Sequence, residues 1–111
     1  MKKIADINVA VPDGITLTAL FETEYGEGNL AVVAHFSEYG EQNAISVNLP
    51  DQAFNLMQPG EFFLKSYSER EGWLEALLAA GIVTHDGTMV RSGYVEIPLV
   101  RLNVGEYKHT E

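Results

Sequence analysis

The sequence has no cysteine, which excludes a thiol nucleophile, a zinc–thiolate centre and a disulfide framework. It also has no apolar run near the roughly 20 residues of a membrane-spanning helix. The N-terminal stretch MKKIADINVAV is interrupted by Asp6 and Asn8, unlike the apolar core of a secretory signal. We therefore expect a cytosolic protein. At 111 residues, one domain can form a core without a metal or disulfide.

Basic residues are missing from more than half of the chain. Residues 4–64 contain no lysine or arginine, whereas residues 62–111 contain seven acids and five bases. The first stretch holds nine acids: Asp6, Asp13, Glu22, Glu24, Glu27, Glu38, Glu41, Asp51 and Glu61. Such a field repels nucleic acid and anionic membranes and attracts basic protein surfaces. We expect a protein partner with a basic surface, no direct nucleic acid and no membrane; charge that serves only solubility is the alternative.

Motifs for common chemistries are also absent. There is no HExxH, calcium-loop, GK[ST] or GxSxG pattern, and the GEG at residues 26–28 lacks the later glycine of a dinucleotide fingerprint. The residues available to an enzymatic interpretation are His35, His85 and Asp86, which share no recognised spacing. We expect no catalytic residue, no metal ligand and no cofactor, and hence a protein that is not an enzyme.

The first half of the chain has the period-two pattern of half-buried strands. Apolar residues alternate in INVAV, ITLTALFET, LAVVAHF and AISVNL, with the turn PDG at residues 12–14. This pattern predicts a four-strand antiparallel meander.

Two similar stretches, EYGEGN at residues 24–29 and EYGEQN at residues 38–43, lie fourteen residues apart. That interval equals one strand of about eight residues plus a turn, so the stretches should cap opposite ends of the strand near residues 29–37. Ends on the order of 25 Å apart cannot close on one small ligand. We interpret the repeat first as turn chemistry, although its acids and tyrosines could also contact a partner.

The second half predicts a short helix over residues 50–57, a strand in EFFLKSY and an amphipathic helix over residues 68–80. Ser68 and Glu71 have the spacing of a capping box, and Leu74, Leu77 and Leu78 form an apolar stripe. A C-terminal hairpin should follow. Because Pro98 has no N–H to donate, we expect its strand at an edge or bulged there, with homodimerisation through the edge near Val95–Leu102 as a hypothesis.

These elements predict an α+β fold with an antiparallel sheet and helices packed on one face. Residues 1–104 should form a single domain, and residues 105–111 a flexible tail.

Two function hypotheses follow. The first is a non-catalytic acidic protein-binding module, an inhibitor or accessory protein of the phage or mobile-element type. In its sharper version the carboxylates replace phosphates in a partner's nucleic-acid groove. Its contact residues would be Glu22, Glu24, Tyr25, Glu27, Glu38, Tyr39 and Glu41. The alternative is a small enzyme or metabolite-binding domain with a pocket between helix 68–80 and the sheet.

Overall fold

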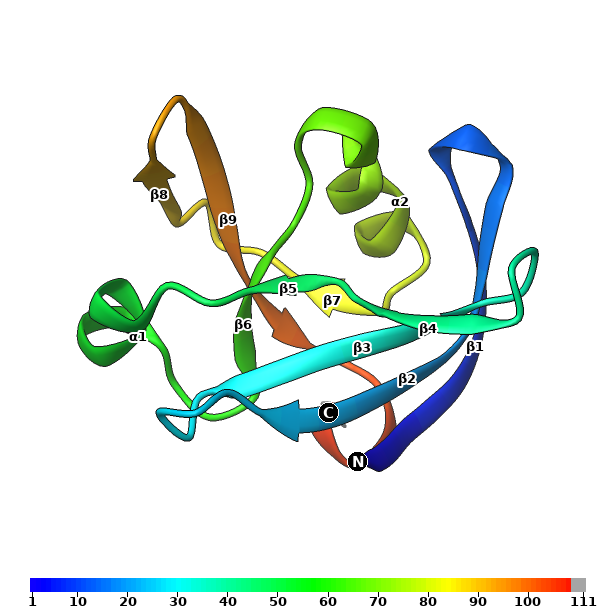
Figure 1. Cartoon of the computed structure of the whole chain (residues 1–111), viewed down its shortest axis with the longest axis horizontal. Coiled ribbons are helices and arrows are strands. Elements are labelled where there is room, and N and C mark those ends of the chain that lie inside the picture. The colour runs from blue at the N-terminus through cyan, green and yellow to red at the C-terminus, as the bar shows by residue number, and fades with distance from the viewer. Residues whose placement is uncertain (109–111) are drawn as a thin grey trace.

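The computed structural model describes residues 1–108, except for the side chains of Asp13 and Glu69. Two antiparallel sheets and two short helices make up the fold (Figure 1), which confirms the predicted α+β class. Residues 109–111 of the expected tail lie outside this description.

The first sheet is the predicted meander. It contains β1 (Lys2–Val11), β2 (Ile15–Glu24), β3 (Leu30–Phe36) and β4 (Glu41–Ala44), in that order. The fourth strand lies earlier than the pattern AISVNL indicated. The chain leaves β3 after Ala44, and two consecutive buried residues, Ile45 and Ser46, carry it into the second sheet as β5 (Ser46–Val47).

The second sheet has the order β5, β6 (Glu61–Leu64), β9 (Val95–Leu102) and β7 (Val83–Thr84). β8 (Met89–Ser92) also pairs with β9, on the same side as β7, and forms the expected C-terminal hairpin with it. β9 therefore has neighbours on both sides, and the expected edge along Val95–Leu102 is not present as predicted.

Pro98 acts within this interior strand. The ladder between β6 and β9 ends at the pair Phe63 and Leu99, one residue before Pro98. On the other side Leu99 donates its N–H to Thr88, so the alternation of an antiparallel ladder points the nitrogen of Pro98 toward β6. Pro98 therefore lacks its N–H at the position where the ladder between β6 and β9 has already ended. On the side of β9 that faces β6, the stretch Val95–Pro98 has no strand partner in the described part of the chain. Homodimerisation through this stretch stays a prediction.

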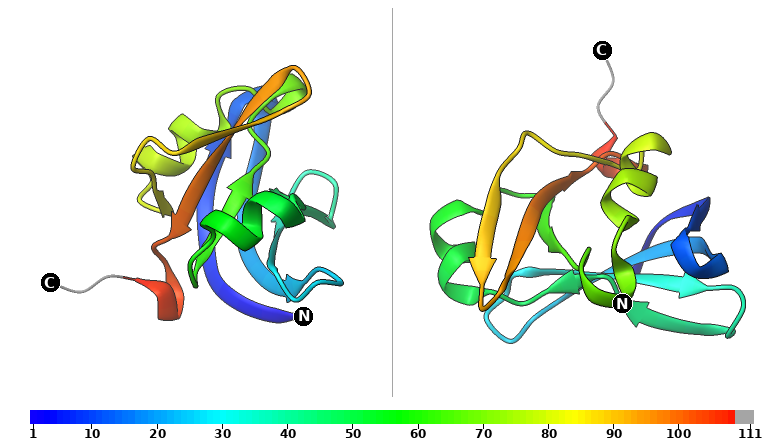
Figure 2. Two further views of the ribbon diagram at one scale, coloured as in Figure 1. Left: turned by 90° about the vertical axis from the view of Figure 1, so that its left-hand side faces the viewer. Right: turned by 90° about the horizontal axis from the view of Figure 1, so that it is seen from above.

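Two apolar clusters hold the layers together. The larger one joins the inner face of the first sheet, one face of the second sheet and α2 (Trp73–Ala79), with Leu17, Phe62 and Trp73 at its centre. The smaller one lies on the opposite face of the second sheet, where Ala53 of α1 (Pro50–Leu56) packs near Phe63 and Ile97. The helices therefore pack into different clusters rather than sharing one face (Figure 2).

The helix expected over residues 68–80 begins later than its capping box predicted. Ser68–Arg70 form a 3₁₀ turn, Ser68 has a φ of 57°, and Gly72 precedes α2 with a φ of 90°. The N-cap positions are Tyr67 for the turn and Gly72 for α2, and neither makes a side-chain cap hydrogen bond. Instead Leu74 donates its N–H to Ser66 Oγ at 3.0 Å, so a serine eight residues earlier satisfies a donor of the first turn.

The C-terminal segment is docked where a tail was expected. Gly105–Tyr107 form a 3₁₀ turn against β1, and Tyr107 packs on the larger apolar cluster. Gly105 approaches β1 so closely that a Cβ there would overlap the carbonyl oxygen of Ile4. A glycine at this position lets the turn lie on the strand, a contact that the polar sequence did not indicate.

None of the helices described for residues 1–108 has the length and apolarity needed to cross a membrane.

Candidate functional site

The two EYGE stretches occupy opposite ends of β3, as predicted (Figure 1). They do not fold alike. In the first, Glu24 ends β2 and Gly28 takes the positive φ of 88°; in the second, Gly40 has the φ of 62° and Glu41 begins β4. Seven residues of β3 separate the turns, about 23 Å at 3.3 Å per residue. The seven predicted contact residues therefore do not form one compact site.

The first turn is fixed to the second sheet. Tyr25 donates its N–H to Asn29, and its hydroxyl lies 2.7 Å from Ser46 Oγ. The carboxylate of Glu27 accepts a hydrogen bond of 3.1 Å from Asn48, just before α1. Tyr25 is thus a structural side chain rather than the exposed anchor that was predicted, whereas Glu24 and Glu27 stay at the surface.

In the second turn, Glu38 is held by one backbone N–H and one serine hydroxyl. Glu38 accepts hydrogen bonds from the N–H of Thr16 at 2.8 Å and from the hydroxyl of Ser37 at 3.1 Å. The bond from Thr16 is the main reason why the pKa of Glu38 is lowered. Tyr39 is 63% exposed, and Glu41 accepts from Asn43. This end of the sheet therefore presents a fixed negative charge beside an exposed aromatic ring.

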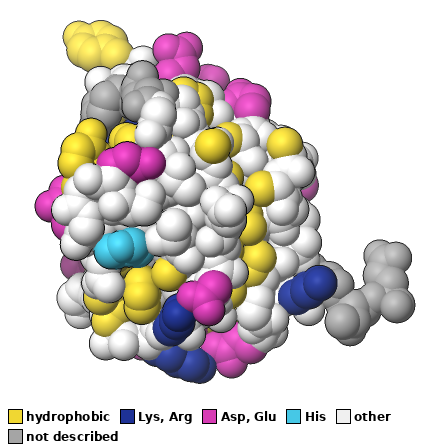
Figure 3. All heavy atoms as spheres, turned by 90° about the vertical axis from the view of Figure 1, so that its right-hand side faces the viewer, with side chains coloured by type: hydrophobic (Ala, Val, Ile, Leu, Met, Phe, Trp, Pro, Cys, Tyr) yellow, Lys and Arg dark blue, Asp and Glu magenta, His cyan; other side chains and the backbone are white. Residues whose placement is uncertain are grey.

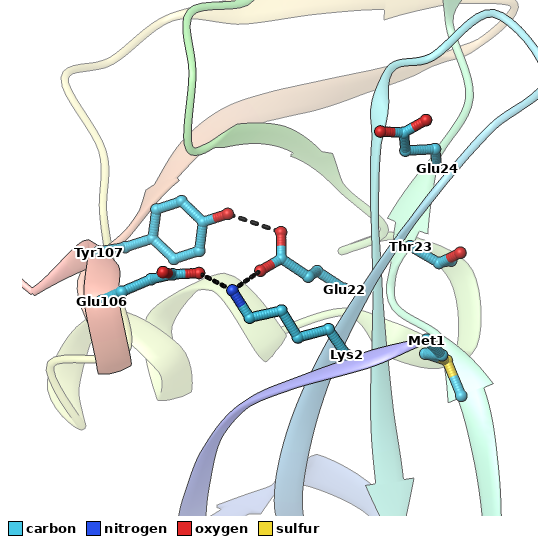
Figure 4. A pocket seen from close by; sticks show the side chains of 7 residues that line it. All are labelled: Met1, Lys2, Glu22, Thr23, Glu24, Glu106 and Tyr107. Carbon is cyan, nitrogen blue, oxygen red and sulfur yellow. Dashed lines mark hydrogen bonds and ion pairs between the residues drawn. The ribbon is translucent and has the colours of Figure 1, made fainter.

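Glu22 belongs to a third location. It pairs across β2 and β3 with the fully buried Val32, so its side chain starts on the core-facing side of the sheet. Tyr107 donates its hydroxyl to Glu22 at 2.6 Å, and Lys2 lies 3.9 Å from Glu22 and 2.8 Å from Glu106. Figure 4 shows these four side chains converging. Glu22 therefore ties the chain ends together and is little available to a partner.

This network borders an open pocket of about 550 Å³, which Met1, Thr23 and Glu24 also line. Burial, and then the hydrogen bond to Glu22, raises the pKa of Tyr107 to about 12. The ion pair with Lys2 lowers the pKa of Glu106. The polar groups of the network form hydrogen bonds and ion pairs with one another, as expected for a structural contact.

Asp6 pairs with Lys3, but five other acids of the first half have no basic neighbour among the described residues. In the described part of the chain, no lysine or arginine lies within 4 Å of the carboxylates of Glu24, Glu27, Glu38, Glu41 and Asp51. Their hydrogen bonds, where present, come from neutral groups. Figure 3 shows the acidic side chains of one side of the molecule in several separate groups, with lysines and arginines toward its lower part.

The residues available to an enzymatic interpretation are not brought together. His35 lies in β3 of the first sheet, whereas His85 and Asp86 lie between β7 and β8. His85 Nε2 is 2.9 Å from the carbonyl oxygen of Thr88, and Asp86 accepts from both the hydroxyl and the N–H of Thr88. These bonds, with the hydroxyl first, lower the pKa of Asp86. Both side chains therefore order a loop.

An open pocket of about 480 Å³ lies beside the end of the helix expected over residues 68–80, where Ala80 and Gly81 line it together with Ala5 and Asp6 of β1. The space between α2 itself and the sheets holds apolar side chains. Trp73 and Leu77 are buried there, and Phe36 packs against Trp73 with ring centres 5.7 Å apart. Arg70 stacks on the Trp73 ring at 4.8 Å and donates to the carbonyl of Ala44. Among the described residues, no group of three or more His, Asp or Glu side chains is arranged to hold a metal ion.

The structure adds one surface residue that the sequence analysis missed. Phe54 of α1 is 90% exposed although Ala53 beside it is buried. Asp51 lies three residues before Phe54 in α1, and residues three apart lie on the same side of a helix. The sequence signal for this residue is the stretch FNLM, in which the polar Asn55 lies between the apolar residues Phe54 and Leu56.

Compared with protein-family models, curated proteins and solved structures, the chain has no significant match.

Proposed function

We propose that this chain is a non-catalytic protein-binding module that recognises a basic surface on its partner in the cytosol. The observation that carries the proposal is the set of five carboxylates, on Glu24, Glu27, Glu38, Glu41 and Asp51, without any ion-pair partner in the described part of the chain. Unpaired surface charges of one sign steer a partner of the opposite sign and fix its orientation.

The placement of these acids supports a broad contact rather than a small site. The two acidic turns stand at opposite ends of a seven-residue strand, and hydrogen bonds hold Glu27 and Glu38 in place. Charges that are already ordered lose little entropy on binding. A basic partner that spans both turns, such as a nucleic-acid-binding groove occupied by an inhibitor or accessory protein, fits this spacing.

Charge reversal tests the proposal, with tagged protein used to capture partners from a lysate of the source cells. The variant Glu24→Lys/Glu27→Lys/Glu38→Lys/Glu41→Lys should lose at least about 90% of the captured basic partner, because each repulsive contact replaces an attractive one. A control that reverses two acids at the start of α2, Glu71→Lys/Glu75→Lys, should capture as the unmodified chain does. Equal capture by the quadruple variant, once its fold is checked by circular dichroism, would contradict the proposal.

A further inference from the structure

Phe54 belongs to α1, a segment that lies close to the first acidic turn. Asn48, just ahead of α1, binds Glu27 in the first turn, and Figures 1 and 2 show α1 and this turn on the same side. Asp51 stands one helical turn before Phe54. These two segments therefore carry Glu27 and Asp51, neither of which has a basic partner in the described chain.

Both segments are held in place. Ala53 is buried in the smaller apolar cluster, and Met57 packs against it. Tyr25 is bound to Ser46, so the acidic turn is fixed to the same sheet on which α1 rests. An exposed aromatic side chain on a segment that is held in place, with acids on the same segment and on the neighbouring turn, resembles a binding hot spot, in which a ring supplies the affinity and charges around it supply specificity.

We infer that Phe54 is the apolar anchor of the docking surface, and that its occupant is an amphipathic basic segment with an apolar strip between lysines or arginines. This inference rests on the proposed function and names its contact point. Charge decides the occupant: a second copy would bring the same unpaired acids to the interface, and an anionic membrane would repel them. Only a basic partner compensates Glu27 and Asp51 while it covers the ring.

The test uses two synthetic peptides of equal charge. One is a helix of lysine and leucine with the leucines on one face; in the other, serine replaces every leucine. Fluorescence anisotropy at low salt measures the binding of each to the unmodified chain, to Phe54→Ala, and to Tyr94→Ala as the exposed aromatic control between β8 and β9. The Phe54→Ala variant should bind the leucine peptide at least about tenfold more weakly, with no change for Tyr94→Ala or for the serine peptide.

The outcomes separate this inference from the proposed function. If both peptides bind in a salt-sensitive manner and Phe54→Ala does not change their affinity, Phe54 is not the anchor. The proposed recognition of basic partners by the acids would then still hold. An equal loss in Tyr94→Ala would also overturn the inference. Failure of both peptides to bind at low salt would overturn the proposed function together with the inference. A dimer in light scattering that Phe54→Ala dissociates would show that a second copy is the occupant.

Discussion

At the scale of single residues, Tyr107 joins the end of the described chain to its first two strands. Its ring packs beside Gly60, where an added Cβ would lie 3.1 Å from it, and its hydroxyl reaches Glu22 at 2.6 Å. A hydrogen bond to a partly buried carboxylate contributes more than one between neutral groups. This contact could not be predicted from the sequence, because 85 residues separate the two partners and a lone tyrosine in a polar segment has no periodicity.

The variant Tyr107→Phe should reduce the free energy of unfolding by about 1–2 kcal/mol at neutral pH, measured by urea denaturation. The pKa of Tyr107 is raised in the folded state to about 12, from 10.0. Between these values the unfolded chain loses its proton before the folded chain does, so this contribution is complete below pH 10 and disappears as the pH rises to about 12.

Between pH 10 and about pH 12, the free energy of unfolding of Tyr107→Phe should therefore fall less than that of the unmodified chain. Tyr94→Phe, at the exposed tip of the hairpin, is the control for removing a hydroxyl. Identical pH profiles for Tyr107→Phe and the unmodified chain would contradict the contact with Glu22.

At the scale of elements, strands were more predictable than helix ends. Period-two alternation identified β1, β2 and β3. It also indicated the closing hairpin, although β9 buries side chains on both faces, Ile97 and Leu99 in the smaller cluster and Val100 and Leu102 in the larger one. The start of α2 was wrong because a capping box describes local spacing alone. Gly72 took the left-handed conformation beside Pro12, where an added Cβ would lie 3.0 Å from the proline ring, and tertiary contact thus decided where the helix began.

Two serine variants distinguish these alternatives. Ser66→Ala should cost about 1 kcal/mol of stability, because the N–H of Leu74 loses its acceptor. Ser68→Ala should cost less than about 0.5 kcal/mol, since Ser68 is the N-cap residue of neither the turn nor α2. Chemical denaturation of both variants measures the difference. A larger loss for Ser68→Ala would restore the capping box that the sequence indicated and contradict the start of α2 at Trp73.

At the scale of the whole molecule, the position of β9 illustrates what the sequence left open. Pro98 indicated an edge or a bulge, yet β9 lies between β6 and the pair β7 and β8, because a proline interrupts only the side toward which its nitrogen points. The charge pattern was visible in the sequence. The placement of its acids in separate groups was not, since it depends on which turns the sheets bring to each end.

The central claim, recognition of a basic partner by unpaired acids, is tested most directly by affinity capture from a lysate of the source cells at about 50 mM and about 500 mM salt, with mass spectrometry. Screening shortens the reach of exposed charges from roughly 14 Å to roughly 4 Å over this range. We predict a basic protein that is retained at the lower salt concentration and released at the higher one. Absence of any specific partner at both concentrations, or retention that salt does not change, would contradict the account.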